Sequence, residues 1–151
     1  MDKMTQTIAQ DPELDMLIGY QLQMARLRLM EAAHAALAPY GISPARVTAL
    51  ALIRSQPGLD QSALGRALSI NRASAMKLVN LLVERGLVER RPGRNLRSHA
   101  LHLTCEGATQ LPEMIARLRE SEAPLLADLD DAERTALLAL LHRIHAPLSR
   151  D

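Results

Sequence analysis

The sequence has no phenylalanine and no tryptophan, and its only tyrosines are Tyr20 and Tyr40. Apolar residues nevertheless make up 48% of the 151 residues, so a core must be built from Leu, Ala, Ile, Val and Met. Ala, Leu and Met favour helices, whereas strands are usually rich in aromatic and β-branched residues. The composition therefore predicts a mainly α fold, in one domain at this length. It also argues against modules that stack nucleic-acid bases on exposed rings.

Several protein classes are disfavoured by simple patterns. No apolar run approaches the roughly 20 residues that a membrane span needs, and residues 1–14 lack the apolar stretch of a secretory signal. The single cysteine, Cys105, cannot form an internal disulfide, which suits a reducing compartment. We therefore expect a cytoplasmic protein without a membrane partner.

The net charge of +1 conceals an uneven distribution along the chain. Residues 60–104 hold eight basic residues against three acidic ones, a net charge of +5. Residues 1–59 are neutral, and residues 105–151 carry a net charge of −4. A basic middle segment between neutral and acidic flanks is typical of polyanion binding, although charge alone also fits a solvated basic face.

Capping signals divide the first half of the chain into helices. Asp11-Pro12 and Ser43-Pro44 each join an N-cap residue to a proline, and they predict helices over about 11–38 and 43–56. A short helix over 60–68 is followed by a helix that Asn71 begins and Gly86 ends. Two helices joined by so tight a turn are typical of a helix-turn-helix.

After Gly86 the pattern predicts strands over 87–91 and 99–103, joined by a turn at 92–95. This hairpin would form a β-wing with Arg94 and Arg97 at its tip and Arg90 and Arg91 at its base. The two helices and the wing together predict a winged helix-turn-helix core.

Two further helices are expected after the wing. Thr104 can cap a helix that runs to about residue 126, and Pro112 within it should cause a kink or a later start. Asp130 and Glu133 have the spacing of a capping box that begins the last helix.

The stretch from Ser69 to Gly107 resembles the MarR family of bacterial transcription regulators. The resemblance is carried by Leu78-Val79, Leu82, Glu84-Arg85-Gly86-Leu87-Val88, Arg97, Leu101-His102-Leu103-Thr104 and Gly107. It extends over the chain, because members of the family flank such a core with one helix before it and two after it. It implies that residues 1–38 and 105–151 form a helical dimerisation region around a DNA-binding core at 39–104.

The resemblance also implies a set of DNA-binding residues. In this family the second helix of the motif enters the major groove of a palindromic operator, and a wing arginine reaches the adjacent minor groove. Carried over by position, the groove-facing residues are Asn71, Arg72, Ala73, Ser74, Met76 and Lys77, with Arg97 and its neighbour Arg94 on the wing. The expected partners are double-stranded DNA and a second copy of the chain.

The sequence departs from the family pattern at two places. Asn95 stands where an aspartate usually holds the wing arginine, so a hydrogen bond there has no charge assistance. Ala73 and Met76 stand where small hydroxyl residues are frequent. Readout should then rely more on thymine methyl groups and on DNA shape.

Family members respond to small amphipathic ligands, often aromatic carboxylates or their CoA thioesters, held between the dimer helices and the winged core. A stripe on the first helix offers candidate ligand-binding residues: Tyr20, Gln21, Met24 and Arg28. Arg28 would pair with a carboxylate and Met24 would pack on a ring. The alternative is an arginine whose stem merely covers apolar surface.

No catalytic constellation is present, so an enzyme is the least favoured class, and no cofactor is expected. His142 and His145 share a helix face without a further ligand pair to complete a metal site. Cys105, at the start of a helix, allows a redox-responsive alternative. The leading hypothesis is a ligand-released repressor; the others are a ligand-independent architectural DNA-binding protein and a winged helix that binds proteins.

Overall fold

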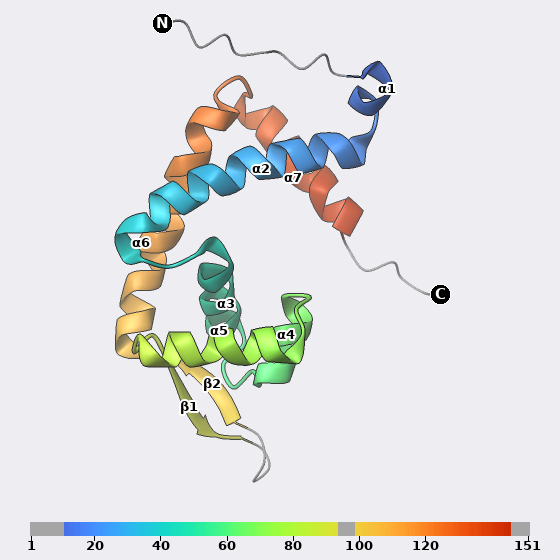
Figure 1. Cartoon of the computed structure of the whole chain (residues 1–151). Helices are drawn as coiled ribbons and strands as arrows, with labels where there is room; N and C mark the ends of the chain where they lie inside the picture. The colour runs from blue at the N-terminus through green and yellow to red at the C-terminus, as the bar shows by residue number, and fades with distance from the viewer. Residues whose placement is uncertain (1–10, 94–98, 146–151) are drawn as a thin grey trace, which may run out of the picture.

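The computed structural model describes residues 11–93 and 99–145. The described elements are, in chain order, α1 (Pro12–Asp15), α2 (Ile18–Leu37), η1 (Ala38–Tyr40), α3 (Pro44–Ser55), α4 (Gln61–Ala67), α5 (Arg72–Glu84), β1 (Val88–Pro92), β2 (His99–Leu103), α6 (Cys105–Glu122), η2 (Ala123–Leu126) and α7 (Asp131–His145). In Figure 1, α2 and α7 lie at one end of the molecule, whereas α5 and the two strands lie at the other. The mainly helical fold with a two-stranded wing is confirmed.

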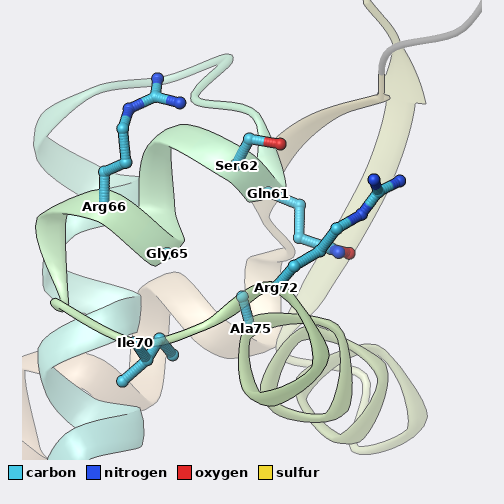
Figure 2. Close-up of a pocket in the computed structure, with 7 residues that line it drawn as sticks. All are labelled: Gln61, Ser62, Gly65, Arg66, Ile70, Arg72 and Ala75. Carbon is cyan, nitrogen blue, oxygen red and sulfur yellow. The ribbon is translucent and has the colours of Figure 1, made fainter.

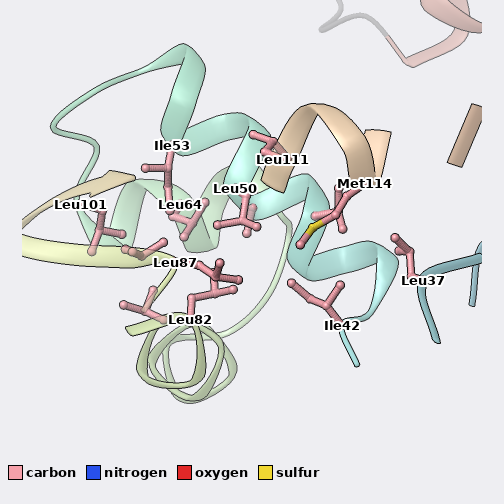
Figure 3. Close-up of a cluster of buried hydrophobic side chains, with 14 residues drawn as sticks. Leu37, Ile42, Leu50, Ile53, Leu64, Leu82, Leu87, Leu101, Leu111 and Met114 are labelled. Carbon is pink, nitrogen blue, oxygen red and sulfur yellow. The ribbon is translucent and has the colours of Figure 1, made fainter. Parts of the chain in front are cut away.

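The core is aliphatic, as the composition predicts. Its buried side chains come from α2 to α6 and from both strands. In Figure 3, Leu64, Leu82, Leu87 and Leu101 lie together near the strands, and Leu111, Met114, Ile42 and Leu37 extend the cluster away from them. The largest of them are Leu37, Leu50, Ile53, Leu64, Leu82, Leu101, Leu111 and Met114. Tyr40 packs against this cluster while only half-buried. The core is therefore filled by leucine, isoleucine, valine and methionine, where other domains also bury aromatic side chains.

Side-chain caps begin most of the helices where the sequence indicates them. Asp60 accepts a hydrogen bond from the Ala63 amide at 2.7 Å, and Thr104 accepts one from Gly107 at 3.0 Å. Such caps satisfy backbone donors that would otherwise have no partner. Ser43 occupies the cap position of α3 but makes no side-chain cap bond within the described part of the chain, so there Pro44 carries the start signal.

The prediction of one continuous first helix is wrong, because the structure has two helices, α1 and α2, with a break between them. Met16 ends α1, and Leu17 adopts an extended conformation with φ −85° and ψ 115°. The Asp15 carbonyl oxygen, released by the break, accepts a hydrogen bond from the Gln21 side-chain amide at 3.0 Å. Gly19 lowers the local helix propensity next to the break. A side chain thus replaces the backbone donor that a continuous helix would supply.

The hairpin forms as predicted, with β1 one residue later than expected. The strands are antiparallel, and Val88 pairs with Leu103 while Pro92 pairs with His99. Gly86 takes φ +69° after α5, and the amide of Leu87 donates to the Leu82 carbonyl at 3.0 Å. This left-handed glycine turns the chain directly from α5 into the wing. The predicted tip residues Arg94 and Arg97, and Asn95, lie outside the described residues.

The helices after the wing differ from expectation at their ends. α6 begins at Cys105 with Pro112 inside it, so the proline does not delay the start. The helix ends at Glu122, and the chain continues as a 3₁₀ turn to Leu126. The capping box is confirmed: the Asp130 amide donates to Glu133 at 2.9 Å, and the Glu133 amide donates to Asp130 at 2.8 Å. Among the described residues, no single helix is long and apolar enough to cross a membrane.

Candidate nucleic-acid interface

Helices α4 and α5 pack closely against each other where they cross. A Cβ atom on Gly65 would lie 3.2 Å from the Cβ of Ala75, so the glycine allows the two helices to approach. Ser69 adopts φ +54° in the turn, and the Ile70 amide donates to the Gly65 carbonyl at 3.0 Å. The Asn71 side chain then caps α5 by accepting from the Ser74 amide at 2.8 Å. The motif is therefore a rigid two-helix unit that presents α5.

One face of α5 is buried and the other is exposed. Ala75, Val79 and Leu82 are buried in the core. Met76 is 49% exposed although it is a large apolar residue. The six predicted groove-facing residues all lie on the exposed surface: Asn71, Arg72, Ala73, Ser74, Met76 and Lys77. Their arrangement suits insertion of the N-terminal half of α5 into a groove, and their contact with DNA stays a prediction.

Positive charge from both helices gathers beside this face. A hollow of about 240 Å³ between α4 and α5 is lined by Arg66 and Arg72, with Gln61 and Ser62 between them in Figure 2. A second hollow of about 260 Å³ joins Arg72 to the wing, where Arg90 and His99 line it. Side chains of this kind suit the phosphate backbone, because arginine, glutamine and serine all donate to phosphate oxygens.

Three of the arginines in the basic segment have partners within the protein. Arg90 donates from Nη2 to the Asn80 Oδ1 at 2.6 Å, which joins the wing base to α5. Arg91 donates from Nε to the Glu89 carboxylate at 2.8 Å. Arg85 donates to the backbone carbonyl of Tyr40 at 3.0 Å. These three arginines stay exposed and charged, but their guanidinium groups are already oriented by partners in the protein.

Sequence reasoning missed three polar residues of this surface. Gln61 and Ser62 begin α4 and line the hollows, and Asn80 lies on the exposed side of α5. The Asp60 cap was a usable signal for the first two, since it places them in the first turn of a helix. For Asn80 the signal was its spacing from Met76 and Lys77 on the same helix face.

The predicted ligand stripe on α2 is mostly exposed. Tyr20 is half-buried, while Met24 and Arg28 are exposed. Gln21 is exposed as well, and its amide already bonds Asp15 across the α1–α2 break. A ligand role for these four residues stays a prediction.

The structure shows another hollow, of about 660 Å³, between the end of α2 and α6. It is lined by Ala35, Ala36, Pro39, Tyr40, Glu113, Arg117, Glu120 and Ser121. The Glu113 carboxylate, by hydrogen bonding with the phenol, raises the pKa of Tyr40 above its ordinary value, and the Arg117 guanidinium opposes this. The hollow thus combines an apolar wall on α2 with a phenol and a guanidinium.

The remaining candidate groups from the sequence are a cysteine and a pair of histidines. Cys105 is exposed at the start of α6. The imidazole rings of His142 and His145 lie 5.4 Å apart in an edge-to-face arrangement. Within residues 11–93 and 99–145, no group of three or more His, Cys, Asp or Glu side chains is placed to hold a metal ion.

Comparison with known proteins identifies the family. The sequence profile of the MarR family matches residues 40–97, which comprise α3, the helix-turn-helix and the first strand of the wing. The transcriptional repressor CouR bound to a 23-mer DNA duplex is 32% identical, with a TM-score of 0.81, and the match covers 88% of this chain and 95% of that one. The chain belongs to the MarR family. Its winged helix-turn-helix between flanking helices is the architecture of these regulators.

A second structure of CouR and one further relative are also similar to this chain. CouR bound to p-coumaroyl-CoA is 30% identical, with a TM-score of 0.79 over 91% of this chain and 98% of that one. A protein of Thauera aromatica, assigned to the regulation of the hcr operon, is 36% identical over 106 residues. That match spans 70% of this chain and 64% of the relative, less than two thirds of its length. The names of both relatives describe regulators of transcription.

Proposed function

We propose that this MarR-family chain is a homodimeric repressor that binds a palindromic operator and is released by a small amphipathic ligand. The observation that carries the proposal is the exposed N-terminal half of α5, with Arg66 and Arg72 beside it. The Asn71 cap and the close packing of α5 on α4 hold this surface in one orientation, as insertion into a DNA groove requires. CouR, its relative, has been captured both on DNA and with a CoA thioester.

The dimer part of the proposal comes from exposed apolar surface. Leu138 and Ile144 of α7 are 59% and 61% exposed, and α7 buries none of its residues against the described part of the chain. Other large apolar side chains are exposed on the first helices, at the same end of the molecule in Figure 1: Leu14, Met16, Leu17, Ile18, Leu22 and Leu27. Exposed apolar side chains in such number favour a protein interface. A second copy of the chain would bury them and set two α5 helices on one face.

DNA binding is tested by the salt dependence of affinity. Wild type and Arg72→Ala are titrated onto a fluorescent duplex selected from a random pool, at several salt concentrations. Removing a cation that neutralises one phosphate should reduce the slope of log K against log salt by about 0.9. We expect weaker binding and a smaller slope for Arg72→Ala.

Arg119→Ala is the matched control, because it removes the same charge from an exposed position on α6. It should leave both affinity and slope unchanged. Equal effects of the two substitutions would mean that only overall charge matters, and salt-independent binding by the wild type would contradict the proposal.

For the effector, we propose an aromatic acid or its CoA thioester, the class to which the ligand of CouR belongs. Thermal unfolding with p-coumaroyl-CoA tests this, because a ligand that binds the folded state raises its apparent stability. Arg28→Ala tests the predicted α2 stripe and Arg117→Ala tests the hollow between α2 and α6, with the exposed Arg26→Ala as control. A shift that all three variants retain would reject both sites. A ligand that stabilises the protein but leaves DNA binding intact would favour the architectural alternative.

A further inference from the structure

Arg85 belongs to the basic segment by sequence, yet it does not lie with the other cations. It caps the C-terminal end of α5, the end opposite Asn71 and Arg72. Its Nη1 donates to the carbonyl oxygen of Tyr40 at 3.0 Å, across 45 residues of sequence. In Figure 1 this end of α5 lies on the side of the molecule where α2 turns into α3. We call this hydrogen bond the Arg85–Tyr40 contact.

Gly41 lies against the guanidinium. It adopts φ +58°, and a Cβ atom there would lie 3.4 Å from both Nη1 and Nη2 of Arg85, at van der Waals contact. A side chain at this position would therefore meet the guanidinium, and the left-handed backbone disfavours most residues other than glycine. The contact thus joins two segments that are separate in the sequence.

Tyr40 links the contact to a third element. Its ring packs against the core, and its phenol interacts with Glu113 and Arg117 of α6. One residue therefore engages α5 through its backbone and α6 through its side chain, at the end of α2. A change in the angle between α2 and α6 would move the carbonyl that Arg85 holds.

We propose that Arg85 is a positioning residue that sets the orientation of α5 relative to the flanking helices, and that it does not bind DNA phosphate. The inference rests on the proposed function as a dimeric DNA-binding regulator. In a twofold dimer, the orientation of each α5 helix determines which half-site separation both can reach at once. The Arg85–Tyr40 contact would then select the spacing of the operator.

The first test separates positioning from phosphate binding. Arg85→Met keeps the backbone cap but removes the guanidinium, and it is compared with Arg72→Met and Arg119→Met on the duplex selected by the wild type. We expect Arg85→Met to raise Kd about tenfold, because only a fraction of the variant molecules would hold α5 in the orientation that binds DNA. The slope of log K against log salt should stay unchanged. A slope reduced by about 0.9, the value for one phosphate left without its cation, would overturn the inference.

The second test measures the half-site spacing directly. Wild type, Arg85→Met and Gly41→Asn each select duplexes from the same random pool, and the half-site separations are sequenced. Asn tolerates the left-handed conformation and places an amide side chain against the guanidinium without changing any charge. Both variants should select a broader range of separations, extended by about one base pair from the spacing near one DNA turn. Spacings identical to those of the wild type would overturn the inference.

The two proposals fail in distinguishable ways. If the wild type selects no palindrome, the proposed function is wrong. If the wild type selects a palindrome and the variants select the same one with equal Kd, only the role of Arg85 is wrong. Circular dichroism of each variant identifies a folding defect. If Arg85→Met does not fold, the spacing selected by Gly41→Asn tests the role of Arg85.

Discussion

Replacing Gly107 by alanine should destabilise the protein although alanine is the better helix former. Gly107 is buried in the first turn of α6, and a Cβ atom there would lie 2.1 Å from the carbonyl oxygen of Leu87. Ordinary contact requires this oxygen to move by about 1 Å, and overpacking of this kind costs about 1–3 kcal/mol. The same oxygen accepts a hydrogen bond from the Thr104 amide at 3.1 Å, and breaking that bond costs about 1 kcal/mol.

Alanine in a helix gains about 1 kcal/mol over glycine, so the net destabilisation for Gly107→Ala is about 1–3 kcal/mol. For a chain of this size that lowers Tm by roughly 2–4 °C per kcal/mol. Urea and thermal unfolding at equal protein concentrations measure it, since a dimer has a concentration-dependent stability. Ala108→Gly, at the exposed neighbouring position, calibrates the helix propensity alone and should cost about 1 kcal/mol. A Gly107→Ala protein as stable as the wild type would refute the packing of α6 on the wing.

Four further substitutions test other parts of the account. Leu138→Asp should convert the dimer to a monomer in light scattering, whereas Ala139→Asp, at a small exposed residue about 100° around α7 from Leu138, should not. Asn71→Ala removes the α5 cap and should cost about 1 kcal/mol in urea unfolding; unchanged stability would show that the cap bond contributes nothing. Asp130→Ala should reduce stability by about the same amount through the capping box of α7, measured by thermal unfolding. Arg97→Ala, at the predicted wing tip, should weaken binding to the selected duplex, and unchanged affinity would exclude its minor-groove role.

Much of the fold was readable from the sequence because its signals are local. Asp60, Asn71 and Thr104 begin their helices by bonding amides three residues away. Gly86 ends α5 because the chain needs a left-handed residue there. The break between α1 and α2 was not readable, since neither proline nor glycine occupies it and the Gln21 amide stabilises it from six residues away.

The exposure of the predicted α5 surface could be read from the sequence, whereas the contacts of the arginines around it could not. The exposed face of α5 follows from helical periodicity once the buried stripe is known. The direction in which each arginine points cannot be read from the sequence in this way, because a count of charges treats all arginines alike. Arg85 and Arg90 turn toward Tyr40 and Asn80, which are brought to them only by folding. The hollow between α2 and α6 likewise joins residues far apart in the sequence, such as Ala35 and Glu113.

The central claim is that two copies of this chain read DNA through their α5 helices. Hydroxyl-radical footprinting of the protein on duplexes selected from a random pool tests it most directly. The account predicts two protected regions related by twofold symmetry, with centres about one helical turn apart, and no protection by the Leu138→Asp protein at the same concentration. A single asymmetric footprint, or protection that is equal on unselected duplexes, would contradict it.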